Sequence, residues 1–459
     1  MNGGISRGDG SPYPPMPARA KTVRAVLGID LGTSGVKVLV ADLAGRLLGR
    51  GMAGYPVRVP GGGQAETDPG DWWLATRTAV RRAMAEAGHV TVTALAVAGQ
   101  MHGLVLADAA GTPLRPAILW LDQRAAAEAA TYAELPRDYT AVLGSRPSPG
   151  MAGPLLSWLM TREPCTVRAS WWALQPKDWL RLRLTGQAAT DPTDASGTLL
   201  FDLARGTWAE PLIEKLGLPR EKLPPVADSA AIAGRLRPGP AADLGLPPGI
   251  PVAVGAADTA AALFAAGLRP DEAMLNLGSG GQWVASESGF RPAAATNLYR
   301  AVGGGYYRLA PVQNVGITLD WVRDLLGATW DELYGTAARP RRADAPRFDP
   351  HLVPERWSPG ATAAWTGLTL AHQREDLMRS ALDGVAGLLR QRLDDLRAAG
   401  CAPSRVVLGG GGTRNPAWRA LLEETLDLPL RHAATTWLTP AGAARLAAEA
   451  LQSLGSPTS

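Results

Sequence analysis

Near its amino terminus the chain reads Leu27-Gly28-Ile29-Asp30-Leu31-Gly32-Thr33-Ser34-Gly35-Val36-Lys37-Val38-Leu39-Val40. Two apolar runs flank a short turn of small residues, which predicts a β-hairpin. The glycines allow backbone N–H groups to converge on one point, an arrangement that suits a phosphate group. Asp30 lies at the end of the first run, where its carboxylate is placed to hold Mg²⁺ or the water around it. Gly32, Thr33 and Ser34 are therefore candidate phosphate ligands.

A second hairpin of this kind lies in the other half of the chain, at residues 274–284. Its turn contains Gly278, Ser279 and Gly280. Either turn alone has a simple conformational explanation, because tight hairpin turns favour these residue types. Two copies, the first with a carboxylate, favour phosphate binding and suggest a duplicated fold that encloses a nucleotide from both sides.

The length of 459 residues exceeds what one hydrophobic core usually serves, so it predicts two domains. A stretch rich in Pro and Gly at residues 237–251 places the boundary at residue 250. The N-terminal domain would then span residues 23–250 and the C-terminal domain residues 251–459. Residues 1–22 are rich in Gly, Pro and Ser and are expected to form a disordered tail.

Strand-like and helix-like patterns alternate along the chain, which predicts an α/β fold. We expect strands at residues 92–97, 104–106, 118–121, 252–257 and 406–408, and helices from Pro69 after an Asp68 cap and over residues 374–399. In such folds, functional residues gather at strand ends and in the loops that follow.

Charge and composition limit the classes of protein to which this chain can belong. The net charge of +4 comes from Lys and Arg dispersed among Asp and Glu, without a run of five cations, so we expect no nucleic-acid partner. The chain contains no run of 18 apolar residues, so we expect no membrane span. Cys165 and Cys401 lack metal or redox spacing, so we expect two reduced, buried thiols in a cytoplasmic protein. A monomer and a homodimer both remain open.

Asp258 is the leading candidate for a general base. It follows an apolar strand, lies among small residues that leave space, and opens an Ala-rich helix whose amino terminus favours a carboxylate. A hydroxyl that attacks a terminal phosphoryl group needs such a proton acceptor. The alternative is that Asp258 only caps its helix, and residues alone leave both interpretations open.

Three other groups have both a functional and a structural interpretation. His102 follows a strand end and is either a ligand of a substrate hydroxyl or a buried histidine bonded to backbone. Asp122 and Arg124 either orient a polyol or form an ordinary ion pair. The run Gly409 to Gly412 either allows close approach of a ligand or is a flexible connector.

Several motifs, in order along the chain, resemble the FGGY family of carbohydrate kinases, and within it the xylulokinase group most closely. The resemblance covers residues 25–448 and rests on residues 28–37, the loop Gly99-Gln100-Met101-His102-Gly103, residues 118–124, the stretches 175–181 and 191–202, and the glycine run 409–412. The loop at residues 99–103 is the signal most specific to that group.

The resemblance implies an α/β protein of two ribonuclease-H-like domains, as in actin-like ATPases, with a cleft between them. It implies ATP and Mg²⁺ as cofactors and a ketopentose, D-xylulose first, as the substrate that is phosphorylated to its 5-phosphate. The carried-over roles are a catalytic base at Asp258, a metal ligand at Asp30, sugar contacts at Gln100, Met101, His102, Asp122, Arg124 and Thr259, and nucleotide contacts at Gly32, Thr33, Ser34, Gly278, Ser279, Gly280, Gly410, Gly411, Gly412 and Asn415.

The chain departs from the family pattern at several positions. Thr259 stands where the family has Asn, Gly280 replaces a turn hydroxyl, and Leu155 replaces a Lys. The family's Ser-Gly-Glu-Arg segment is reduced to residues 353–359. These departures keep open a kinase for another ketose or polyol and a catalytically impaired sugar- or nucleotide-binding relative. An actin- or chaperone-type ATPase is the third alternative.

Overall fold

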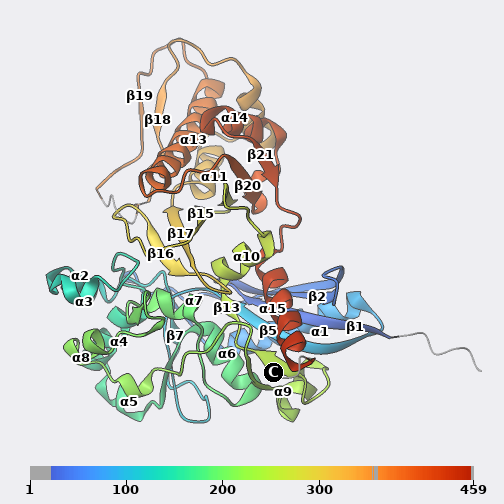
Figure 1. Cartoon of the computed structure of the whole chain (residues 1–459). Helices are drawn as coiled ribbons and strands as arrows, with labels where there is room; N and C mark the ends of the chain where they lie inside the picture. The colour runs from blue at the N-terminus through green and yellow to red at the C-terminus, as the bar shows by residue number, and fades with distance from the viewer. Residues whose placement is uncertain (1–21, 354, 356–359, 456–459) are drawn as a thin grey trace, which may run out of the picture.

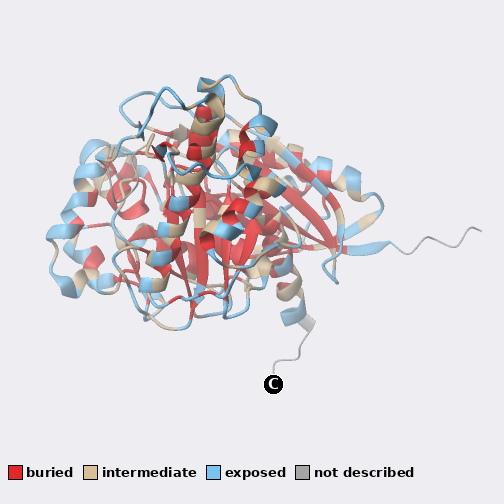
Figure 2. Cartoon of the chain, turned by 90° about the horizontal axis from the view of Figure 1, so that it is seen from above, coloured by how far each residue is buried: buried red, intermediate tan, exposed pale blue. Residues whose placement is uncertain are grey.

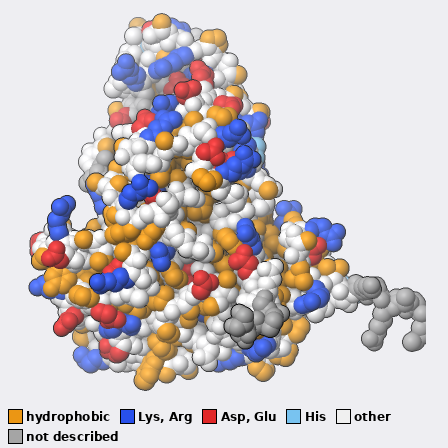
Figure 3. Space-filling model, viewed as in Figure 1, with side chains coloured by type: hydrophobic (Ala, Val, Ile, Leu, Met, Phe, Trp, Pro, Cys, Tyr) orange, Lys and Arg blue, Asp and Glu red, His pale blue; other side chains and the backbone are white. Residues whose placement is uncertain are grey.

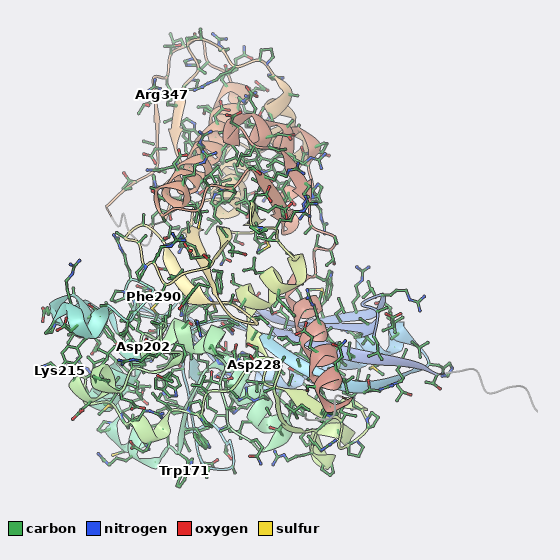
Figure 4. The ribbon with its side chains drawn as sticks, in the orientation of Figure 1. Trp171, Asp202, Lys215, Asp228, Phe290 and Arg347 are labelled. Carbon is green, nitrogen blue, oxygen red and sulfur yellow. The ribbon has the colours of Figure 1, made fainter. Side chains whose placement is uncertain are left out.

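The computed structural model describes residues 22–353, 355 and 360–455. Figure 1 shows two lobes that lie one above the other. Trp171 lies at the far end of one lobe and Arg347 at the far end of the other (Figure 4). The expected tail and most of residues 353–359 lie outside the described residues. No helix among the described residues combines the length and apolar character needed to cross a bilayer.

The first domain is built on a mixed sheet. An antiparallel meander of three strands is followed by strands parallel to the first of them, and a further strand closes the edge. The sheet contains β1 (Val23–Leu31), β2 (Gly35–Asp42), β3 (Leu47–Gly54), β5 (Val90–Gly99), β11 (Ile232–Arg235), β12 (Pro251–Ala253) and β13 (Ala256–Ala257).

The second domain repeats this plan. Its antiparallel meander is β14, β15 and β17, and β20 and β21 run parallel to β14. The strands are β14 (Glu272–Leu277), β15 (Gly281–Glu287), β16 (Asn297–Arg300), β17 (Tyr306–Val312), β20 (Arg405–Gly409) and β21 (Leu430–His432). The repetition confirms the expected pair of ribonuclease-H-like domains, and both predicted hairpins form, as β1–β2 and β14–β15.

Helices form layers around the two sheets. The helix α1 (Pro69–Ala87) begins after its Asp68 cap, as expected, and covers one face of the first sheet. Between the sheets lie α10 (Asp258–Ala266) and α15 (Leu438–Gly455), while α11 (Gly316–Leu325), α13 (Arg374–Ala398) and α14 (Pro416–Leu426) cover the far face of the second sheet. Figure 2 shows the burial concentrated in these central layers.

The remaining short elements lie mainly on the first domain. They are β4 (Glu66–Thr67), β6 (Val105–Ala107), β7 (Ala117–Ile118), α2 (Ala126–Glu134), α3 (Arg137–Thr140), α4 (Ala152–Arg162), α5 (Pro164–Ala169), β8 (Trp172–Leu174), α6 (Pro176–Thr185), α7 (Pro192–Ala195), η1 (Ser196–Thr198), β9 (Phe201–Asp202), β10 (Thr207–Trp208), α8 (Glu210–Lys215), η2 (Arg220–Lys222) and α9 (Pro238–Leu244), with α12 (Trp330–Gly335), η3 (Thr336–Ala338), β18 (Arg347–Asp349), β19 (Ala364–Thr366) and η4 (Gly411–Thr413) on the second. Phe290 of the second domain, labelled in Figure 4, packs against an apolar cluster that includes Phe201 of the first domain and Tyr306 of the second.

The domain division differs from the boundary expected at residue 250. The strands β12 and β13 pair with β5, so they belong to the first sheet. The Pro- and Gly-rich stretch 237–251 is a local connection within this domain that contains α9. The chain enters the second sheet only at β14, and α15 returns to pack on β1 and β5 (Figure 1).

Two further expectations need correction. The strand expected at residues 118–121 ends at Ile118, because Asp122 N–H bonds to Leu119 O at 3.0 Å and turns the chain. Cys165 is exposed rather than buried, whereas Cys401 is buried, and both are free thiols. Charges of both signs are interspersed over the face shown in Figure 3.

Candidate active site

A cavity of about 160 Å³ lies between the two domains. Its polar wall comes mainly from the first domain, and its aromatic and apolar wall comes partly from the second. The lining residues are Thr33, Gln100, Met101, His102, Trp120, Asp258, Thr259, Gln282, Tyr299, Leu309 and Pro311. Alternating hydroxyl, amide, imidazole and carboxylate groups in a small space suit a polyhydroxylated ligand.

Asp258 occupies the first position of α10, directly after β13. Its Oδ1 accepts hydrogen bonds from the backbone N–H of Thr259 and from Thr259 Oγ1, the latter at 3.1 Å. Burial raises the pKa of Asp258 to about 6, while the two bonds from Thr259 lower it. The carboxylate is therefore mainly ionised at neutral pH and able to accept a proton. The cap residue of the helix is Ala257, so the side chain of Asp258 is directed to the cavity.

We predict that Thr259→Val moves the acid limb of activity to higher pH. A base must be deprotonated, so activity is lost as pH falls through the pKa of Asp258, about 6. Removing the hydroxyl donor destabilises the ionised form and raises that pKa. The measurement is the pH profile of kcat/KM for wild type, Thr259→Val and Thr259→Ser, where serine retains the donor. The charge of Asp258 also influences the pKa values of Asp30 and Asp194. The difference in apparent pKa between the variants, rather than its value in wild type, therefore identifies Asp258 as the group that titrates. An unchanged profile in Thr259→Val contradicts the prediction.

His102 lies at the end of β5 in a left-handed backbone conformation with φ of 64°. Such a conformation is uncommon for a residue other than glycine and frequently occurs at functional sites. Its Nδ1 donates a hydrogen bond to Gly197 O at 2.7 Å, so the neutral ring presents Nε2 as an acceptor. The histidine is thus both buried against backbone and part of the cavity wall, and its contact with a substrate hydroxyl stays a prediction.

The loop that carries His102 also contacts the second domain. Tyr307 OH donates to Met101 Sδ at 3.4 Å, and the rings of His102 and Tyr299 lie 6.2 Å apart. On the other side, Gln100 N–H donates to Leu31 O at 2.8 Å. Gln100, Met101 and His102 therefore lie where both domains and the end of β1 meet.

Asp30 lies at the end of β1, opposite Lys37 and beside β5. Burial raises its pKa to about 7, Lys37 lowers it and the charge of Asp258 raises it. In the adjoining turn Gly32 N–H donates to Gly35 O at 3.0 Å, which closes the hairpin. The carboxylates of Asp30 and Asp258 thus lie close enough to influence each other in one buried region.

The second turn lies beside the glycine run. Gly409 pairs with Asn276 in parallel strands, so both loops leave the same edge of the sheet. Gly410 has φ of 82°, and a Cβ there would lie 2.2 Å from Leu277 O, so only glycine fits. Ile317 N–H donates to Ser279 O at 2.8 Å and fixes the start of α11 against this turn. Gly410 and Gly412 therefore lie beside Leu277, the residue directly before the second turn.

The sequence matches the N-terminal domain of the FGGY family of carbohydrate kinases over residues 25–265 and the C-terminal domain over residues 283–451. The chain belongs to the FGGY family of carbohydrate kinases. This kinase is 34% identical to the xylulose kinase of Escherichia coli strain K12 over 431 residues, covering 92% of this chain and 89% of that protein. It is 29% identical to the xylulose kinase of Bacillus subtilis strain 168, with 86% and 82% covered. The crystal structure of a xylulose kinase from Rhodospirillum rubrum matches with a TM-score of 0.83 and 28% identity, with 93% and 90% covered.

Two residues expected to contact a sugar, Asp122 and Arg124, are not among the residues that line the cavity. Asp122 is fully buried and accepts hydrogen bonds from Ala65 N at 2.7 Å and from Arg124 Nη2 at 2.8 Å. Arg124 also bonds to Glu66 at 2.7 Å. The two side chains thus form the ion pair of the second interpretation, and a sugar contact by either of them stays a prediction.

Asn415, expected to contact the nucleotide, is the cap residue of α14. Its Oδ1 accepts hydrogen bonds from Ala417 N at 3.0 Å and Trp418 N at 3.2 Å, so the side chain caps α14. Leu155, where the family has Lys, is fully buried in an apolar cluster with Leu104. The apolar side chain at this position therefore packs in the core of the first domain.

Five lining residues were not predicted as site residues from the sequence: Trp120, Gln282, Tyr299, Leu309 and Pro311. Trp120 donates from Nε1 to Thr33 Oγ1 at 2.9 Å, and its place within the motif at residues 118–124 was a usable signal. Gln282 and Tyr299 reach the cavity only because the second sheet faces the first. Their local sequence gives no sign of this placement.

Proposed function

We propose that this kinase transfers the terminal phosphoryl group of ATP to a ketopentose, converting D-xylulose to D-xylulose 5-phosphate. The observation that carries the proposal is the common cavity of Asp258, His102 and Thr33, which joins a base, a sugar-binding loop and a phosphate turn. The names of the relatives at 34% and 29% identity support D-xylulose as the sugar.

In the proposed reaction Asp258 accepts the proton of the sugar hydroxyl that attacks the phosphorus. Its carboxylate is ionised at neutral pH and is held by Thr259. The imidazole Nε2 of His102 accepts a hydrogen bond from a sugar hydroxyl and orients the chain of the ketose. The backbone N–H groups of the two turns hold the phosphates, and closure of the domains excludes water that would otherwise hydrolyse ATP.

A divalent cation fits beside Asp30. Within the described part of the chain no three His, Cys, Asp or Glu side chains gather as a metal cage. Mg²⁺ in kinases is commonly held by one or two carboxylates together with substrate phosphates and waters, so a full cage is not required. Asp30 is a buried carboxylate whose pKa is raised to about 7, and a cation would favour its ionised form. Mg²⁺ held there would neutralise charge on the phosphates.

A substrate panel tests the proposal. Purified protein with Mg²⁺ and ATP is assayed for ADP release with D-xylulose, other ketoses and polyols, and without sugar. We expect the largest sugar-dependent rate with D-xylulose and a product phosphorylated at O5. A larger rate with another sugar would correct the substrate. Calorimetric sugar binding without ADP release would support the impaired-relative alternative, and sugar-independent ATP hydrolysis would support the ATPase alternative.

A further inference from the structure

Five charged side chains lie buried together behind the cavity. Lys177, Asp178, Arg181, Asp191 and Asp194 are each at most 1% exposed, and we name them the buried charge cluster. Lys177 Nζ lies 2.6 Å from Asp178 Oδ1, 3.1 Å from Asp191 Oδ1 and 3.5 Å from Asp194 Oδ2. Arg181 Nη1 lies 2.9 Å from Asp178 Oδ1. The sequence stretches 175–181 and 191–202 supply all five.

The buried charge cluster is a costly way to stabilise a core. Desolvating ionic groups offsets much of their mutual attraction, and apolar side chains of similar size often stabilise equally well. Among the described residues neither carboxylate oxygen of Asp194 accepts a hydrogen bond, and burial raises its pKa well above the usual range. A role other than stability would explain why such a group of charges lies here.

One branch of hydrogen bonds leads from the cluster to Asp258. Asp191 Oδ2 accepts from Thr193 Oγ1 at 2.6 Å and from Ser229 Oγ at 2.7 Å. Thr193 Oγ1 in turn accepts from the backbone N–H of Ala257 at 2.9 Å. Ala257 directly precedes Asp258, so the hydroxyl of Thr193 fixes the backbone from which the proposed base projects.

A second branch leads to the sugar loop and to the second domain. Gly197 O accepts the hydrogen bond from His102 Nδ1 at 2.7 Å. A Cβ at Gly197 would lie 2.9 Å from that same nitrogen, so the position admits only glycine without displacing the ring. Ser196 Oγ accepts from the backbone N–H of Arg300 on β16 at 3.1 Å. The segment 191–198 therefore contacts the residue before the proposed base, the histidine and the second domain.

We propose that segment 191–198, anchored by Lys177, positions Asp258 and His102 relative to each other for phosphoryl transfer. Thr193 and Gly197 are its two positioning residues, since each acts through a residue that lines the cavity. The inference rests on the proposed function and deepens it. It predicts separate kinetic effects for the two branches, because one holds the base and the other holds the group that binds sugar.

The test compares Thr193→Val with Thr336→Val in the full chain. Thr336 is also a buried threonine, and its Oγ1 donates to Leu333 O at 2.7 Å in the second domain, outside the cavity. We expect Thr193→Val to lower kcat at least about tenfold with little change in KM for ATP, since loss of ordered geometry at the reacting centre has effects of this order. Thr193→Ser, which retains the hydroxyl, is expected to have a kcat close to that of wild type. Thr336→Val is also expected to have the wild-type kcat once the rate is divided by the concentration of folded protein. Equal kcat in Thr193→Val and Thr336→Val at matched folded fraction overturns the inference.

The second branch is tested by Gly197→Ala. We expect a rise in the KM for the ketose of about tenfold with a smaller change in kcat, because the added methyl displaces His102. Wild type assayed in parallel separates the two claims, since an inactive wild type refutes the proposed function. Crystal structures of Thr193→Val and Gly197→Ala give a readout independent of turnover. Displaced Asp258 and His102 side chains, respectively, support the inference, and unmoved side chains overturn it.

Discussion

Asp258→Asn is expected to lower kcat of ketose phosphorylation by about 100- to 10,000-fold, the range that general bases contribute. The amide has nearly the shape of the carboxylate but does not accept the proton of the attacking hydroxyl. Because the amide oxygen of Asn can still accept the hydrogen bond from the backbone N–H of Thr259, the fold and ATP binding are expected to remain. Steady-state kinetics together with calorimetric binding of ATP measure the two effects separately.

The matched control is Asp331→Asn on α12, which makes the same charge change at an exposed position of the second domain. It is expected to leave kcat within twofold of wild type, since it lies outside the cavity. If Asp258→Asn retained a tenth or more of the wild-type kcat, another group would have to take the proton.

Gly28→Ala is expected to destabilise the first domain by about 3 kcal/mol, the upper part of the usual range for overpacking a core. A Cβ at Gly28 would lie 2.0 Å from Pro440 O and 2.4 Å from Ala444 N, both backbone atoms of α15. The helix must move away from β1, which opens the layer between the sheets. Urea unfolding followed by tryptophan fluorescence measures the change.

Gly54→Ala provides the comparison for this substitution. Gly54 ends β3 in the same sheet, is exposed, and its added Cβ would lie 3.6 Å from the nearest atom, Ser34 O, which is ordinary contact. We expect a change within about 0.5 kcal/mol. Similar unfolding midpoints for the two variants would contradict the prediction, because they would show that the close contact between β1 and α15 contributes little to the free energy of unfolding.

The features predicted best are those determined by short-range chemistry. Both hairpins follow from apolar runs around small-residue turns, and the long helix expected over residues 374–399 forms at Arg374–Ala398 because its apolar spacing is regular. Asp258 could be singled out because it follows an apolar strand, lies among small residues and opens an Ala-rich helix, although these features also fit a helix cap. Gln100, Met101 and His102 share the cavity with it, as the strand-end position indicated.

The features missed depend on long-range packing. The bonds of Asp122 to Ala65 N and of Arg124 to Glu66 join segments about 60 residues apart, so nothing in their own motif distinguishes an ion pair from a ligand set. The domain boundary differs from the expected one because the Pro- and Gly-rich stretch 237–251 connects β11 and β12, two paired strands of the same sheet, and does not link two domains. Tyr299 lines the cavity through the facing of the two sheets, which no local pattern specifies.

Single-turnover transfer of radiolabelled phosphate from the terminal position of ATP to D-xylulose, in wild type and Asp258→Asn, is the most direct measurement. We predict that wild type places the label on the sugar and that the variant does so at least about 100 times more slowly. Equal transfer rates in both proteins, or label released by wild type only as inorganic phosphate, would contradict a ketose kinase whose base is Asp258.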